Sequence, residues 1–245
     1  MRQYTRVFKP TEVCMMLASF SNTETINIAA YSYLLDTIGM PEVEYEAFLR
    51  IKEMRDKYEY MQSFNTSTKL DIAKTLAMFG AFTEGLQLFA SFAILLNFPR
   101  FNKMKGMGQI VTWSARDETL HTNSIIRLFH TFLSENPEVK SKDLFEDLKN
   151  ACSIVVGHED SFIDKAFELG GVEGLDAENV KKYIRYIADN RLNQLGIDPI
   201  YNVGKNPLPY MDEMLNSLEH ANFFESRATE YSRAATQGTW DEAFS

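Results

Sequence analysis

Two short segments of the chain place possible metal ligands three residues apart. Glu118 precedes His121 in the sequence RDETLH (116–121), and Glu24 precedes Asn27 in the sequence ETIN (24–27). On a helix, positions i and i+3 share one face, so Glu118 and His121 could bind metal from adjacent turns. A single Glu-x-x-His pair is weak evidence, because such pairs also arise by chance on solvated helix faces.

The apolar surroundings of two further glutamates strengthen this interpretation. Glu84 lies in FTEGLQLFASFAILL (82–96), which is apolar on nearly every face, and Glu24 also has mostly apolar neighbours along the chain. A buried carboxylate without a partner is costly, so each glutamate is expected to meet a cation or to carry a proton. Inward-facing glutamates with a histidine are typical ligands of iron or manganese, and less typical of zinc.

The composition is that of an ordinary folded protein. The chain has 245 residues, of which 45% are hydrophobic and 24% are charged. A net charge of −9 argues against a nucleic-acid partner, because binding to phosphates requires an excess of Lys and Arg. The start, MRQYTRVFKPTEV, lacks the apolar core of a signal peptide, and the longest apolar run, around residues 89–98, is too short to span a bilayer. We therefore expect a cytoplasmic protein without a membrane segment, in which Cys14 and Cys152 are buried, unpaired thiols.

Helical periodicity dominates the chain, with Gly and Pro between the periodic segments, so we predict an all-α protein. Long helices with short connections favour a bundle with any cofactor in its interior, and we predict a single domain over residues 1–245. Residues 196–209 are predicted to form a loop. The predicted helices are Thr11–Ile38, Glu42–Met54, Ser67–Asn97, Lys103–Ser134, Lys142–Leu169, Ala177–Leu195 and Tyr210–Thr236.

Taken together, these motifs resemble a known family. ETIN (24–27) followed by Tyr31, then Glu84 with Leu88 and Phe92, then RDETLH (116–121), resemble the radical-generating small subunit of class I ribonucleotide reductase. The resemblance covers nearly the whole chain, because it continues in YIADNRLNQLG (186–196), NPLP (206–209) and NFFESR (222–227).

The resemblance implies a ferritin-like helical bundle with a dimetal centre of iron, manganese or both. It implies that Glu24, Glu84, Glu118 and His121 bind metal and that Tyr31 occupies the position of the radical tyrosine. The function implied is that of a ribonucleoside-diphosphate reductase small subunit, which supplies the oxidising equivalent for making deoxyribonucleotides. The partners implied are a large catalytic subunit and a second small subunit, in a homodimer or a heterodimer.

Two of these assignments have simpler alternatives. Tyr31 is seven residues beyond Glu24 and so shares its helix face, but it could merely pack in the core beside Tyr33. Asp117 matches a carboxylate that links the centre to the electron path, but it could instead form a salt bridge with Arg116 or another surface group. His130, His158 and His220 stand at no matching ligand position, and we interpret them as structural or surface residues.

The chain departs from the family pattern at Asn27, which stands where the family has a metal-binding histidine. A neutral amide oxygen is a weaker donor than imidazole, so one metal is expected to be held less tightly. The family also supplies a further Asp or Glu, and a tryptophan of the electron path, from a helix before Glu24 that we do not find in this chain. Three interpretations remain open: a small subunit completed by another chain, a metal-poor auxiliary subunit that supports an active partner, or a divergent ferritin-like dimetal oxidase. Residues 237–245 are the candidate docking tail for the large subunit, with Trp240 and Phe244 as its apolar anchors.

Overall fold

A computed structural model describes residues 4–41, 43 and 50–216 of the chain. Within these residues the protein is helical, and the only β-type pairing is an isolated bridge between Val172 and Leu175. The all-α prediction is therefore confirmed. The helical elements are α1 (Tyr4–Val7), α2 (Thr11–Thr37), α3 (Lys52–Gln62), α4 (Lys69–Ala77), the π-helical η3 (Met78–Glu84), α5 (Phe89–Arg100), α6 (Lys105–Glu135), the 3₁₀ turn η4 (Pro137–Val139), α7 (Lys142–Ala166), α8 (Ala177–Gln194) and α9 (Pro209–Asn216).

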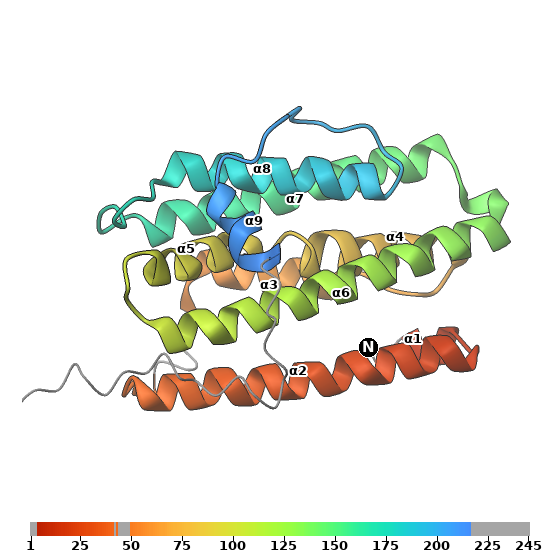
Figure 1. Ribbon diagram of the computed structural model, residues 1–245. Coiled ribbons are helices and arrows are strands. Elements are labelled where there is room, and N and C mark those ends of the chain that lie inside the picture. Colours follow the sequence, from red (N-terminus) through yellow and green to blue (C-terminus); the bar gives the residue numbers. More distant parts are fainter. Residues whose placement is uncertain (1–3, 42, 44–49, 217–245) are drawn as a thin grey trace, which may run out of the picture.

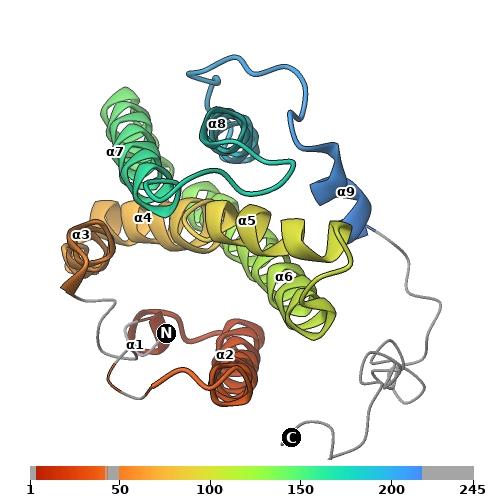
Figure 2. The same ribbon diagram turned by 90° about the vertical axis from the view of Figure 1, so that its left-hand side faces the viewer.

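The long helices form a bundle with α6 in contact with most of the others. α6 packs along α4, η3 and α5, and its opposite side contacts α2. α7 and α8 pack against each other on the far side of the α4–η3–α5 segment, so that α2 and α8 lie at opposite ends of the end-on view (Figures 1 and 2). The core therefore centres on η3, α5 and the middle of α6.

Four of the predicted helices match the structure to within about three residues, because their ends carry readable signals. These are α2, α6, α7 and α8. Ser141 caps the first turn of α7 by accepting the Leu144 N–H, and Asp176 does the same for Asn179 in α8. The predicted loop after α8 is also confirmed. It is fixed by Asp189, whose carboxylate accepts three backbone N–H groups at 2.8–3.0 Å, those of Ile200, Tyr201 and Val203.

The prediction of one continuous helix over Ser67–Asn97 was wrong. α4 starts with a capping box between Thr68 and Asp71, but it passes into the π-helical η3 at Met78 and is followed by a turn over residues 85–88. The Gln87 N–H donates to the Phe82 carbonyl, five residues back, at 3.0 Å. The helical pattern of apolar residues continues through this irregular stretch, so periodicity alone does not reveal it.

The prediction of a helix over Glu42–Met54 was also wrong in its position. Residues 42 and 44–49 lie outside the described part, and the helix found here, α3, continues to Gln62. α3 was missed because its sequence, KEMRDKYEYMQ, is strongly polar and one of its inward residues is a lysine, Lys57, which is only 7% exposed. Of the helix predicted over Tyr210–Thr236, the structure describes only α9, and the single-domain prediction over 1–245 likewise includes residues outside the described part.

The expectation that the longest apolar run is too short to span a bilayer is corrected by the segment Lys69–Arg100. It is 32 residues long, and its apolar window has a mean hydropathy of 1.5, so by length and composition it could cross a membrane. The structure buries 61% of that window inside the bundle. Its apolar character is that of the central helical segment of the core, which is covered by α6 on one side and by α8 on the other.

The close packing of η3 on α6 gives a first prediction. A Cβ atom on Gly80 would lie 2.8 Å from Cγ2 of Ile125, so Gly80→Ala should overpack this contact and reduce the free energy of unfolding by about 1–3 kcal/mol. Gly157, an exposed glycine in α7 with open space around its Cα, is the matched control. Gly157→Ala should be stabilising by up to about 1 kcal/mol, because alanine favours the helix. Urea unfolding of both variants checks this, and equal stability of the two would contradict the packing described.

Candidate metal centre

His121 lies at the centre of a group of three carboxylates. Its Nδ1 atom is 3.3 Å from Glu24 Oε1, 3.6 Å from Glu84 Oε2 and 3.6 Å from Glu118 Oε2. One ligand atom from each of Glu24, Glu118 and His121 can be chosen so that all lie within 4.8 Å of one another. The structure thus brings together the four residues that the sequence singled out, in an arrangement that could surround one cation.

Three elements deliver these side chains. Glu118 and His121 come from successive turns of α6, Glu84 is the last residue of η3, and Glu24 comes from the middle of α2. The His121 ring is oriented by Phe20 of α2, whose ring centroid lies 4.1 Å away. Because α6 contacts both η3 and α2, its inward face is the natural meeting point of the four side chains.

Glu84, Glu118 and His121 are largely buried, and polar atoms of all three lack a hydrogen-bond partner. Among the described residues, Glu84 Oε2, Glu118 Oε2 and His121 Nδ1 are buried without a hydrogen-bond partner. Buried polar atoms of this kind are normally satisfied, so their convergence on one point indicates a missing partner. A divalent cation would satisfy the carboxylate oxygens and the imidazole nitrogen together, and the residues present therefore fit a metal ion.

The pKa values of the group reflect its burial and the closeness of its charges. Burial, followed by the nearby charge of Glu118, raises the pKa of Glu84 to about 8. Burial also raises the pKa of Glu118, while the nearby His121 lowers it. Burial lowers the pKa of His121, but the surrounding carboxylates outweigh it and bring the pKa to about 10. Protons therefore supply the positive charge while no metal does.

The expectation that Glu24 is buried was wrong. Its side chain is 37% exposed, whereas those of Glu84 and Glu118 are 13% and 8% exposed. The apolar residues near Glu24 in the sequence do not bury it, since Ile26 and Ile28 are themselves 60% and 69% exposed. Glu24 is thus the most solvent-exposed of the three carboxylates.

Asn27 and Tyr31 lie one and two turns beyond Glu24, next to Ser114 of α6. The Ser114 hydroxyl donates to Asn27 Oδ1 at 3.4 Å and also hydrogen-bonds Tyr31. Burial raises the pKa of the half-buried Tyr31, with the Ser114 hydrogen bond opposing this and the Glu118 charge adding to it. These side chains line a cavity of about 280 Å³ together with Glu24, Leu88, Phe92 and Glu118. Ser114 was not predicted as a site residue, although its position one turn before Glu118 places it on the same face of α6.

Asp117 lies beside this group but does not join the carboxylates around His121. Burial raises the pKa of its half-buried carboxyl group, while the neighbouring Asn27 amide and the His121 charge lower it. The other histidines of the described part stand apart from the centre. His130 Nε2 pairs with the Gln194 carbonyl at 2.7 Å, and the His158 ring packs on Tyr60.

His220 lies outside the described residues. Both cysteines are unpaired, with Cys152 buried as predicted and Cys14 only partly buried. Burial raises the pKa of the Cys152 thiol to about 12, which keeps it neutral.

Comparison with known proteins decides the family. Residues 1–207 match the family described as ribonucleotide reductase, small chain. The chain belongs to this family. It is 43% identical, over 97% of its own length and 68% of the relative's, to a protein of Invertebrate iridescent virus 3 named as a ribonucleoside-diphosphate reductase small subunit.

Solved structures support the same fold. The ribonucleotide reductase R2 subunit of Clostridium botulinum superposes with a TM-score of 0.77 at 22% identity, over 83% of this chain and 67% of that one. A dimanganese(II) NrdF protein of Streptococcus sanguinis superposes with a TM-score of 0.66 at 21% identity, over 79% and 67% of the two chains. The ferritin-like fold and the reductase small-subunit assignment are thereby confirmed.

The raised pKa of Glu84 predicts how the stability of the metal-free small subunit depends on pH. A carboxyl group that holds its proton more tightly when folded stabilises the fold at low pH, and it loses that contribution as pH rises through its folded pKa. The free energy of unfolding in the presence of a chelator should therefore fall between about pH 5 and pH 8. The raised pKa of His121 acts in the same direction at higher pH.

Glu84→Gln should make this decrease shallower, because glutamine has no proton to lose in this range. The exposed Glu135 at the end of α6 provides the control, and Glu135→Gln should retain the wild-type slope. Urea unfolding at several pH values measures the effect. A wild-type stability that increases with pH over this range would show that the carboxylates are not packed as described.

Proposed function

We propose that the metal centre of this small subunit consists of iron or manganese held by Glu24, Glu84, Glu118 and His121. Three carboxylates are hard, anionic donors and the imidazole is a neutral nitrogen donor, a combination that suits iron or manganese. The observation that carries the proposal is the convergence of buried, unsatisfied atoms of Glu84, Glu118 and His121 on one point. Binding an ion requires Glu84 to ionise and His121 to become neutral, so binding releases protons.

Tyr31 is the residue proposed to hold the oxidising equivalent. When bound, the metal supplies the oxidising power for this chemistry, and the large catalytic subunit uses the equivalent to reduce ribonucleotides. Because burial raises the pKa of Tyr31, its phenol is protonated at neutral pH, and its oxidation must release one proton with the electron. Ser114, which hydrogen-bonds Tyr31 and donates to Asn27 Oδ1, holds the phenol beside the centre. Asp117, beside Asn27, is the proposed link to the electron path.

Asn27 supports a second candidate, an auxiliary small subunit that assists an active partner. In this chain its amide oxygen accepts a hydrogen bond from Ser114, at the position where the family has a metal-binding histidine. Three carboxylates and His121 remain as ligands for one ion. A second ion would lack the histidine ligand that the family has at position 27. A chain with this centre alone would bind one metal and form little or no tyrosyl radical. Membership of the small-chain family favours either role over the third interpretation, a generic ferritin-like oxidase.

Metal analysis distinguishes the two candidates. The wild-type chain should bind about one Mn²⁺ per chain, because it has one complete set of ligands. Asn27→His should strengthen binding at a second position, whereas Asn22→His, which adds a histidine on the exposed side of α2, should not. Electron paramagnetic resonance can count bound Mn²⁺ and, after treatment with iron and oxygen, any tyrosyl radical. A stable radical at near one per chain in the unmodified protein would exclude the auxiliary role.

The outer face of α2 supports the proposal that small subunits pair through it. Over its full length α2 carries only three charged residues, Glu12, Glu24 and Asp36. Its exposed side presents Met15, Ile26 and Tyr33, which are 60–72% exposed. An exposed apolar patch of this kind is typical of an interaction surface. We propose that a second small subunit covers it, in a cytoplasmic homodimer or heterodimer. Residues 237–245, the proposed docking tail for the large subunit, lie outside the described residues.

Charged substitutions on α2 test the proposed pairing. The double substitution Met15→Glu and Ile26→Glu should shift the protein towards monomer, because it places charges in the apolar contact. Leu169 is fully exposed in the turn between α7 and α8, and Leu169→Glu should leave the assembly unchanged. Sedimentation velocity at micromolar concentration measures the outcome. A wild-type monomer, or equal behaviour of the two variants, would refute pairing through α2.

A further inference from the structure

The backbone that follows Glu84 is irregular and needs support from outside its own helix. Residues 85–88 form a turn between η3 and α5. In a regular α-helix the Phe89 N–H would donate to the Gly85 carbonyl, but here it donates to the Leu86 carbonyl at 3.0 Å. The Gly85 carbonyl, next to the ligand residue Glu84, is therefore free to accept a hydrogen bond from another element.

Arg191 of α8 supplies that donor. Its Nε donates to the Gly85 carbonyl at 2.8 Å, and its Nη1 donates to Gln194 Oε1 at 2.9 Å. The side chain is only 7% exposed, and the guanidinium lies over the Phe89 ring, 5.5 Å from its centroid. Both of these acceptors are neutral oxygens. A buried cation is costly, so its placement on this carbonyl is a specific feature of the fold.

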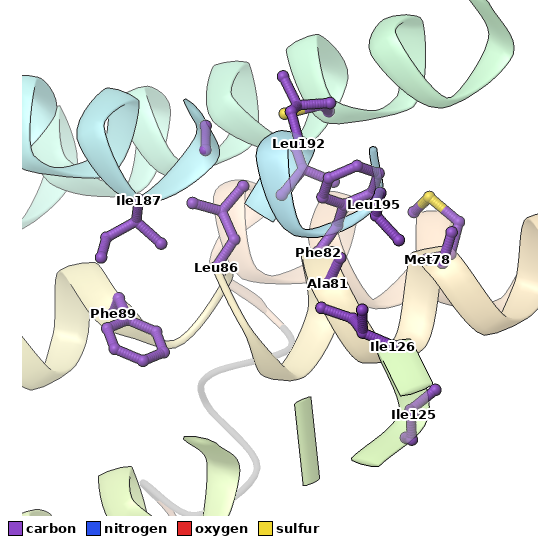
Figure 3. Close-up of a cluster of buried hydrophobic side chains, with 14 of the residues drawn as sticks. Met78, Ala81, Phe82, Leu86, Phe89, Ile125, Ile126, Ile187, Leu192 and Leu195 are labelled. Atoms are coloured by element: carbon purple, nitrogen blue, oxygen red, sulfur yellow. The ribbon is translucent and has the colours of Figure 1, made fainter. Parts of the chain in front are cut away.

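The residues around the turn fit this contact. A Cβ atom on Gly85 would lie 2.7 Å from Arg191 Nε and 2.5 Å from the Ala81 carbonyl, so only glycine allows the guanidinium to reach the backbone. Leu86 is fully buried on the side of α8, where Ile187 and Leu192 also lie (Figure 3). On another side, Lys57 donates to the Gln87 carbonyl at 3.4 Å while forming an ion pair with the buried Glu159.

We propose that Arg191 is a positioning residue for the metal centre: it clamps the turn after Glu84 and thereby fixes the position of the Glu84 carboxylate. The inference rests on the proposed function, since it assumes that Glu84 binds metal. Arg191 itself contacts no ligand side chain in the described structure. It acts through the backbone, from α8, on the one ligand that is delivered by an irregular element rather than by a straight helix.

Mn²⁺ binding by purified full-length variants tests this role. Arg191→Met keeps an apolar stem and removes the donors, so the affinity for Mn²⁺ should fall about 10- to 100-fold, as expected when a residue supporting a ligand is lost. Arg191→Lys keeps a cation and one donor and should recover part of the affinity. Val180→Ala, a buried substitution near the start of α8, controls for loss of stability and should bind Mn²⁺ as the wild type does.

Gly85→Ala perturbs the same contact from the side of the turn, because the added methyl group would meet both the guanidinium and the Ala81 carbonyl. It should weaken Mn²⁺ binding even if Arg191→Met does not fold. The visible absorption of bound Co²⁺, which reports ligand geometry, should change in Gly85→Ala and not in Val180→Ala. Wild-type Mn²⁺ affinity in Gly85→Ala and in every folded Arg191 variant would overturn the proposal. Failure of the wild-type chain to bind Mn²⁺ at all would instead overturn the metal centre itself.

Discussion

The repulsion among three carboxylates placed around one imidazole, inside the bundle, is the constraint on which this structure depends. Glu24, Glu84 and Glu118 lie within 3.6 Å of the same nitrogen atom of His121, and two of the three are largely buried. Such a group is unfavourable unless positive charge is present. Protons supply that charge in the bare protein, and a divalent cation would supply it more fully.

The elements that deliver the ligands differ in rigidity, and this difference explains other features of the fold. Glu118 and His121 are fixed by the long, regular helix α6. Glu84 ends a π-helical stretch, where the backbone would otherwise be free to shift. The buried cations Arg191 and Lys57 donate to carbonyl groups of the turn that follows. These hydrogen bonds partly offset the free energy lost when the two cations are desolvated, and they hold the turn in place. Two of the buried charged residues outside the centre thus support it, whereas the buried Asp189 fixes the loop after α8.

Much of the fold could be predicted from the sequence, because it depends on local signals. The starts of α7 and α8 are marked by Ser141 and Asp176, and the Glu-x-x-His spacing of α6 places two side chains on one face. The π-helix and the turn after Glu84 could not be predicted, since the apolar pattern continues through them and their hydrogen bonds come from residues distant in the sequence. α3 was missed because Lys57 is buried by pairing with Glu159, which is far away along the chain. The exposure of Glu24 depends on which side of α2 faces the bundle, and the polar and apolar residues of α2 are spread around the helix, so its sequence does not reveal that side.

The most direct test of the central claim is calorimetric titration of the metal-free protein with Mn²⁺ near pH 7, in two buffers with different ionisation enthalpies. The difference in heat between the buffers gives the number of protons released per ion bound. If the carboxylates and His121 form the site, binding should saturate near one ion per chain and release at least one proton, because Glu84 and His121 carry protons until the metal replaces them. Saturable binding without proton release, or no saturable binding, would contradict the account.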